Sequence, residues 1–239
     1  MTEFANRLLH DLPASEAARV QQHLIQVPLV RNQVLCAPGQ PILDYHFVTD
    51  GVVSLTMRVN GNDNNGNDND TMCEVGLVGD DGLVGVAALL APDRPSPYQA
   101  VVQVSGTALR VLRPSAVFEA CPVLHRRLMH YTAVLMHQMG QVAACNLRHT
   151  VQERLSRWLL MTHDRLHDNT LPLTQEFLAV MLGVRRAGVS IAANTLQAAG
   201  VVRLGRGRIT VLDVSGLENT ACHCYRTMRQ LYGTAYNNV

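Results

Sequence analysis

The sequence predicts an α+β fold in which a β-rich domain precedes a helical one. Short β-branched runs separated by turn residues occupy residues 26–113, helical periodicity dominates 114–148, and two short helices followed by a hairpin pattern come later. Strands that come first and helices that follow are typical of α+β proteins rather than of alternating α/β folds. We therefore expect a β domain at 1–113, a long helix at 114–148 and a final domain at 149–239.

Length, composition and charge limit the possible functions. A chain of 239 residues fits two ordinary domains, each able to bury its own core. It has no unbroken apolar run of about 18 residues, which excludes a membrane-spanning helix, and residues 1–20 lack a secretory signal, so we expect a cytoplasmic protein without membrane partners. Residues 1–149 hold 10 Arg against 13 Asp and Glu, whereas 150–239 hold 10 Arg against 6. The second part is the candidate for binding nucleic acid.

Several short runs predict the strands of the β domain. The clearest runs are Val48–Met57, Met72–Val78 and Ala100–Val104. Turn signals accompany them at Pro38-Gly39, Asp50-Gly51 and Asp81-Gly82. Many short strands at this spacing indicate a small barrel or sandwich.

Two other segments of the first half have different patterns. Residues 4–24 carry apolar positions at helical spacing, which predicts two short helices joined at Asp11-Leu12-Pro13. Asn60–Asp70 contains no apolar residue, so we expect a mobile hairpin tip there. Its acids lack the spacing of a calcium-binding loop.

Residues 114–148 predict a long helix with a seam for a partner helix. Apolar residues repeat at a spacing of seven, which is the period of a contact between two long helices. The residues expected at this dimer interface are Leu128, Tyr131, Leu135, Met139 and Val142. The alternative is a single helix that lies on its own domain.

The last domain carries the pattern of a winged helix-turn-helix. His149–His163 predicts an amphipathic scaffold helix, Thr174 can cap a second helix that stops at Gly183, and a third helix runs over Arg185–Ala199. Two short helices joined tightly at a glycine form the unit whose second helix enters the DNA major groove. The segment that follows, Val201–Leu212, reads as a hairpin with a basic tip, which would be the wing.

The expected DNA-facing residues lie on the third helix and the wing. From Phe177 through Leu212 there are five Arg and no Asp or Glu, which is the charge that phosphates require. The predicted contacts are Arg185, Arg186, Ser190, Ile191, Asn194, Arg206 and Arg208. Double-stranded DNA is therefore the expected partner.

The order of β domain, long helix, helix-turn-helix and wing resembles the family of the cAMP receptor protein and Fnr (Crp/Fnr). The most specific segments are Gly183-Val-Arg-Arg186 and Gly205-Arg-Gly-Arg-Ile-Thr-Val211. The resemblance implies a cyclic-nucleotide-binding-like β-barrel (jelly roll), a dimerisation helix and a homodimer on a near-palindromic operator, with RNA polymerase as a further candidate partner. It also implies that Arg186 contacts a base. The acid that often follows this arginine is Ala187 here, so the target sequence does not carry over.

The signal that such a domain would sense is not assigned by the sequence. Gly82-Leu-Val-Gly85 resembles the turn of the cyclic-nucleotide members, but it offers no carboxylate for a ribose, and Arg94 does not match the family's phosphate-binding arginine. Cys36 stands alone in the first 70 residues, which argues against an iron–sulfur cluster. Haem stays open, with His125, His130 or His137 and Cys36 or Cys73 as possible ligands. The effector and any cofactor are therefore unknown.

Neither a metal site nor a catalytic site is expected. Six cysteines are scattered along the chain, and Cys222-His223-Cys224 has no second half at metal-binding spacing. No nucleophile with a base and no phosphate loop is evident, so we expect no enzyme. The alternatives are a sensor of haem or another small ligand within the same fold, or a ligand-binding module whose helix-turn-helix contacts proteins.

Overall fold

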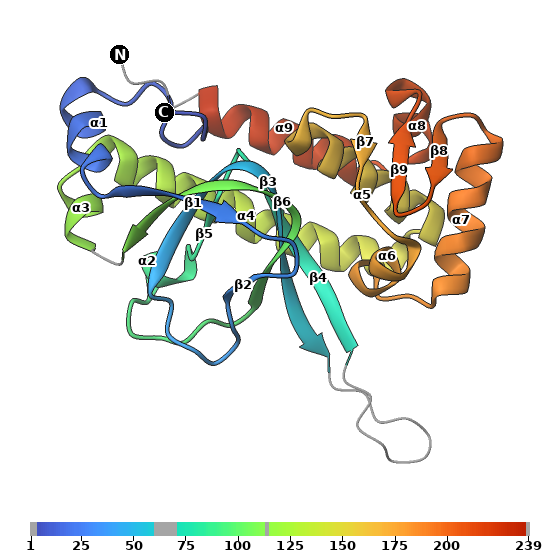
Figure 1. Ribbon diagram of the computed structural model, residues 1–239, viewed down its shortest axis with the longest axis horizontal. Coiled ribbons are helices and arrows are strands. Elements are labelled where there is room, and N and C mark those ends of the chain that lie inside the picture. The colour runs from blue at the N-terminus through green and yellow to red at the C-terminus, as the bar shows by residue number, and fades with distance from the viewer. Residues whose placement is uncertain (1–3, 60–70, 113–114, 238–239) are drawn as a thin grey trace. The chain divides into compact units, whose positions relative to one another are not determined.

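The computed structural model describes residues 4–59, 71–112 and 115–237 (Figure 1). The predicted hairpin tip at Asn60–Asp70 lies outside these residues. The elements up to the β domain's last strand are α1 (Ala14–Gln21), β1 (Leu24–Leu29), β2 (Val34–Cys36), β3 (Asp44–Val59), β4 (Thr71–Val78), β5 (Leu83–Val84), α2 (Ala87–Leu90) and β6 (Gln99–Leu112). The elements that follow are α3 (Ser115–Glu119), α4 (Pro122–Arg148), α5 (Val151–Leu166), β7 (Thr170–Leu171), α6 (Gln175–Leu182), α7 (Arg186–Ala198), β8 (Val202–Gly205), β9 (Arg208–Val211), α8 (Val214–Thr220) and α9 (Cys224–Asn237).

The predicted α+β class is confirmed, with one correction to the β domain. Its described strands form one six-stranded antiparallel sheet of order β1-β6-β3-β4, in which β2 also pairs with β6 and β5 with β3. The sheet is not closed into a barrel, because no ladder joins the edge strands β1 and β4 in the described part of the chain. An open antiparallel sheet replaces the predicted barrel.

Two local predictions in the first half also need correction. Residues before α1 form turns rather than a second helix, and Asp11 has a positive φ of 51° that ends any helical run there. Asp50-Gly51 lies inside β3 and does not end a strand. Gly51 has φ 88°, and an added Cβ would lie 2.5 Å from the Val104 carbonyl oxygen, so only glycine fits this position.

The chain divides into two compact units. The first unit contains residues 1–55, 78–138 and 229–239, and the second contains 56–77 and 139–228. The domain boundaries expected at residues 113 and 148 stay a prediction. No described helix is both long and apolar enough to cross a membrane.

The first unit packs β1, β2, β5, β6 and most of β3 with the first part of α4 around an apolar core. Phe118 of α3 makes edge contacts with Tyr45 and Phe47 of β3, at centroid distances of 5.1 and 6.3 Å. The Glu16 carboxylate accepts hydrogen bonds from the backbone N–H groups of Val123 and Leu124, each at 3.0 Å. A carboxylate there satisfies two of the unpaired donors at the start of α4 and complements the helix dipole.

The second unit is built around α5. Thr150 and Glu153 form a capping box that begins this helix. Trp158 is 1% exposed, packs against Phe177 of α6 at 5.9 Å, and donates its indole N–H to Glu74 of β4 at 2.8 Å. Strand β4, helix α5 and helix α6 are therefore connected through one buried tryptophan.

The predicted long helix over 114–148 is two helices. It breaks at Ala120-Cys121, and α4 starts at Pro122, a residue well suited to the first turn because it needs no N–H partner there. Helices α8 and α9 follow the wing, where the sequence analysis assigned no element.

Candidate nucleic-acid interface

Helices α6 and α7 are joined by a tight turn whose residues determine its geometry. Thr174 begins α6 by accepting a hydrogen bond from the Phe177 N–H at 3.2 Å. Gly183 ends α6 with φ 61°, in the left-handed region that favours glycine. The Val184 N–H returns to the Ala179 carbonyl at 3.0 Å, and α7 begins at Arg186. The predicted pair of helices and its capping residues are found where the sequence places them.

A buried arginine, which the sequence did not predict, stabilises this turn at the end of α6. Arg154 of α5 is 7% exposed and donates from its guanidinium to the carbonyl of Leu182, the last residue of α6. Burial lowers the pKa of Arg154 from its ordinary value. Because that carbonyl has no partner within α6, the arginine stabilises the end of the helix.

Helix α7 presents a polar face with one large apolar residue. Arg185, Arg186 and Asn194 are exposed and Ser190 is half-buried, whereas Val189 and Leu196 are fully buried. Ile191, also on the exposed side, is 70% exposed. Guanidinium and amide groups can form hydrogen bonds to base edges or phosphates, and an aliphatic side chain can contact a thymine methyl group.

Arg186 lies next to a carboxylate. Its Nε lies 3.5 Å from the Glu176 carboxylate of α6, and both side chains are about 70% exposed, at 70% and 72%. An exposed pair of this kind contributes little to stability. The carboxylate nevertheless places a negative charge next to the residue expected to contact a base.

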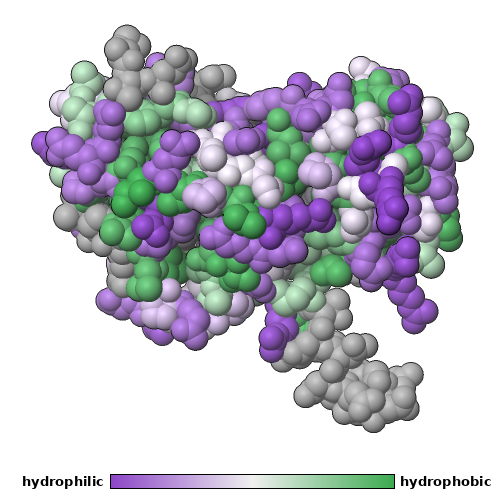
Figure 2. All heavy atoms as spheres, in the orientation of Figure 1, coloured by the Kyte–Doolittle hydropathy of each residue, from purple (hydrophilic) through white to green (hydrophobic). Residues whose placement is uncertain are grey.

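The wing lies beside α7 in the same unit. Strands β8 and β9 pair from Val202↔Val211 to Gly205↔Arg208, and Gly207 at the tip has φ 70°. Gln197 of α7 accepts a hydrogen bond from the Leu204 N–H at 2.8 Å, which ties the hairpin to the helix. The exposed side chains of the hairpin are Arg203, Arg206 and Arg208. Figure 2 shows strongly hydrophilic side chains over this hairpin.

The residues expected at a dimer seam are already packed within one chain. Leu128, Tyr131, Leu135 and Val142 are at most 3% exposed, and Met139 is half-buried. A different side of α4 is open, and it has its own 3-4 spacing of apolar and small residues. These are Met129, Ala133, Met136, Gly140, Ala143 and Leu147, which we call the open seam.

Within the open seam, Met136 and Leu147 are 64% and 84% exposed, and an added Cβ at Gly140 meets no atom within 4 Å.

The residues considered for effector binding lie apart from one another in kind of environment. The possible haem ligands His125, His130 and His137 are exposed on α4, while Cys36 is buried in the first unit. Gly82 packs against the Tyr131 hydroxyl, with no room for a Cβ.

Four metal-binding side chains lie together in the second unit, which the sequence analysis did not expect. The ligand atoms of Cys145, His149, Cys222 and Cys224 all lie within 4.8 Å of one another. A hydrogen bond from the Cys222 thiol lowers the pKa of Cys145 to about 5, and the same bond raises the pKa of Cys222. The sequence showed only Cys222 and Cys224 as a pair of possible metal ligands. The structure adds a second pair, Cys145 and His149, which lie four residues apart at the end of α4.

Known proteins share this fold. Residues 153–220 match the model of the Crp-like helix-turn-helix domain. FixK2 from Bradyrhizobium japonicum is 17% identical, with a TM-score of 0.66, over 83% of this chain and 98% of that one. A regulator of the CRP/FNR family from Thermus thermophilus is 21% identical, with a TM-score of 0.61, over 82% and 98%.

A third similar structure is the c-di-GMP-responsive global regulator CLP from Xanthomonas campestris, which is 16% identical. Its TM-score is 0.63, over 83% of this chain and 99% of that one. At these identities the structural likeness shows the fold. No curated protein sequence matches the chain.

Proposed function

We propose that the chain is a transcription regulator of the Crp/Fnr type that binds a near-palindromic operator as a homodimer under the control of a signal. The match of residues 153–220 to the Crp-like helix-turn-helix domain supports this proposal. In this proposal residues 1–113 sense the signal, 114–148 carry the dimerisation helix, and 149–239 bind DNA. The observation that carries it is the exposed cationic surface formed by α7 and the wing, on a segment without an acidic residue from Phe177 to Leu212.

Arg186 is the proposed base-reading residue. It is the first residue of α7, where the recognition helix of such a fold contacts base edges, and a guanidinium can bind a guanine through two parallel hydrogen bonds. Arg185, Ser190 and Asn194 would contact phosphates or neighbouring bases, and Ile191 a thymine methyl. Arg206 and Arg208 would hold the backbone beside the wing, which adds affinity without sequence information.

The open seam of α4 is the proposed dimer contact. Its six positions follow the 3-4 spacing of a helix pair, and Ala133, Gly140 and Ala143 are small enough for two helices to approach closely. Exposed methionine and leucine side chains at Met136 and Leu147 would gain burial against a second copy. This moves the proposed interface to a different face of α4 from Leu128, Leu135 and Val142.

Selection from random duplex DNA tests the proposal. The purified chain is mixed with a random pool at moderate salt, and the retained fraction is sequenced. Enrichment of a two-fold symmetric motif, with half-sites about one helical turn apart, supports a dimeric regulator. Retention that does not depend on salt, or binding to a protein but to no DNA, would favour the alternative of a helix-turn-helix that contacts proteins.

A further inference from the structure

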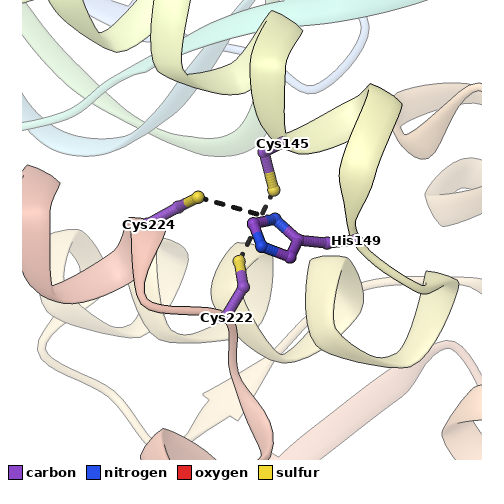
Figure 3. Close-up of side chains that lie close together, drawn as sticks. All are labelled: Cys145, His149, Cys222 and Cys224. Carbon is purple, nitrogen blue, oxygen red and sulfur yellow. Dashed lines mark hydrogen bonds between the residues drawn. The ribbon is translucent and has the colours of Figure 1, made fainter.

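Four side chains from two distant parts of the chain converge in the second unit (Figure 3). Cys145 lies in the last turn of α4, and His149 follows it, held by a hydrogen bond from its own N–H to the Cys145 carbonyl at 3.0 Å. Cys222 lies between α8 and α9, and Cys224 is the first residue of α9. The pairs Cys145/His149 and Cys222/Cys224 are separated by more than 70 residues in sequence.

The spacing of the donor atoms fits a single tetrahedral metal ion. The Cys145 and Cys222 sulfurs are 3.5 Å apart, and the Cys224 sulfur is 3.6 Å from His149 Nδ1. A tetrahedron with metal–sulfur bonds of about 2.3 Å and metal–nitrogen bonds of about 2.0 Å separates two sulfurs by about 3.8 Å and sulfur from nitrogen by about 3.5 Å. All four donor atoms lie within 4.8 Å of one another, so one ion can reach each of them after small rotations.

The donor types select the metal. Three thiolates and one imidazole form a set that structural zinc sites use, and soft sulfur ligands disfavour magnesium and calcium. With four protein ligands the coordination sphere is closed, so the ion would have a structural role rather than a catalytic one. An iron–sulfur cluster requires cysteines that reach different iron atoms, whereas these donors converge on one point.

Buried positive charge next to the four side chains is a second, independent observation. Arg157 is 2% exposed and lies close enough to act electrostatically on Cys145 and Cys222. Its Nη1 contacts the Met161 sulfur at 3.3 Å, its Nε has no hydrogen-bond partner, and among the described residues it pairs with no carboxylate. A buried cation without a counter-charge is strongly disfavoured. Three thiolates on a divalent ion carry one net negative charge, which supplies that counter-charge.

Gln141 completes the surroundings of the site. Its side-chain N–H donates to the Cys224 sulfur at 3.0 Å. Hydrogen bonds from neighbouring groups to ligand sulfurs orient the ligands and stabilise their charge in metal sites.

We propose that Cys145, His149, Cys222 and Cys224 bind one structural Zn²⁺ ion in each chain. The ion would fasten the end of α4 to the segment between α8 and α9. Binding requires three deprotonated cysteines and a neutral histidine, so zinc uptake releases protons and weakens in acid. The site does not depend on the identity of the operator or of the effector.

Metal analysis of the full-length protein tests the site. The chain is purified under reducing conditions, incubated with zinc, desalted and measured by mass spectrometry of the elements. We expect one zinc per chain in the wild type and in His223→Ala, an exposed neighbour outside the site, and in Cys36→Ser, a cysteine of the first unit. Cys145→Ser, Cys222→Ser and His149→Ala should lose it. Wild type without zinc, or equal loss in His223→Ala, would overturn the proposal.

Cobalt substitution keeps the test valid if a cysteine variant does not fold. Wild-type protein stripped by a chelator and titrated with Co²⁺ should show the visible bands of a tetrahedral site and a sulfur-to-cobalt charge-transfer band, saturating at one equivalent. His149→Cys keeps four donors and should strengthen the charge-transfer band by about a third over the wild type, because a fourth thiolate replaces the imidazole. Octahedral spectra, a brown protein with iron and sulfide, or a Cys145–Cys222 disulfide with no metal would each contradict the proposal.

Discussion

Helices α4 and α7 each leave one face uncovered, and the two faces differ in chemistry. The exposed face of α7 carries Arg185, Arg186 and Asn194 beside a single apolar residue, Ile191. The open seam of α4 carries no charged residue, and three of its six positions are alanine or glycine. A helix face without charge and with small residues suits another helix, whereas a cationic face with hydrogen-bond donors suits phosphates and bases. The same secondary structure therefore predicts two different partners.

The largest expected effect comes from placing a charge in the open seam. Gly140→Glu adds a side chain where an added Cβ meets no atom within 4 Å, so the single chain should fold unchanged. It should even gain about 0.5–1 kcal/mol of helix stability over glycine. Sedimentation should show a monomer, and operator affinity should fall about 10²–10⁴-fold because the two half-sites are no longer linked.

Gly140→Ala is the matched control for that variant. It replaces the same glycine without adding a charge, so it should remain dimeric and keep most of its operator affinity. If Gly140→Glu also sediments as a dimer, the open seam is not the interface, whatever happens to DNA binding.

The second prediction concerns the cationic face of α7. Arg186→Ala should cost about 1–3 kcal/mol on the selected operator and relax the preference at one base position. Arg203→Ala, on the exposed side of the wing, should weaken all duplexes about equally and reduce the salt dependence. Fluorescence anisotropy on operator variants with single base changes distinguishes the two. Equal losses on every variant for Arg186→Ala would remove its base-reading role.

The contrast between these helices also explains what the sequence could predict. Thr174, Gly183 and the period of α7 are signals between neighbours in sequence, so the helix-turn-helix and the wing were predicted almost to the residue. The seam of α4 was assigned to Leu128, Leu135 and Val142, because large apolar residues dominate a search for periodicity. Those residues pack inside the chain, and the uncovered face repeats through smaller ones, such as Gly140.

The cysteine and histidine cluster shows the limit of local patterns. Cys145/His149 and Cys222/Cys224 are each short spacings that are common by chance, and only the fold brings the two pairs together. The open sheet has the same cause, since strand runs such as Val48–Met57 predict strands but not whether β1 meets β4. Helices α8 and α9 were not predicted, although Asp213 directly after the wing caps α8 by accepting a hydrogen bond from the Gly216 N–H.

The third prediction separates the stability of the second unit from the proposed recognition of DNA by α7. Trp158→Phe keeps an aromatic ring against Phe177 but removes the donor to the Glu74 carboxylate, which is 2% exposed. Loss of a buried hydrogen bond to a charged group should cost about 1.5 kcal/mol of unfolding free energy. Urea denaturation measures it, and the order of preference among operator variants should stay as in the wild type.

Glu74→Gln and the double variant complete the cycle for this pair. If the tryptophan acts through Glu74, the cost of Trp158→Phe should shrink in the Glu74→Gln background. An unchanged cost would show that the effect of Trp158→Phe comes from packing alone.

The smallest expected effect concerns the carboxylate next to Arg186, the proposed base-reading residue. Glu176→Gln removes the charge 3.5 Å from Arg186 Nε, frees the guanidinium and removes a negative group near the expected phosphates. Operator affinity should rise by a few fold, consistent with about 0.2–1 kcal/mol for an exposed ion pair. Stability should change in the opposite direction: the unfolding free energy should fall, because Glu176 lies in the first turn of α6, where a negative charge favours the helix by about 0.3–1 kcal/mol.

The same substitution in the Arg186→Ala background separates the two routes to higher affinity. The part of the affinity gain that acts through the arginine should disappear there. An affinity gain of the same size would mean that Glu176 acts on the phosphates directly.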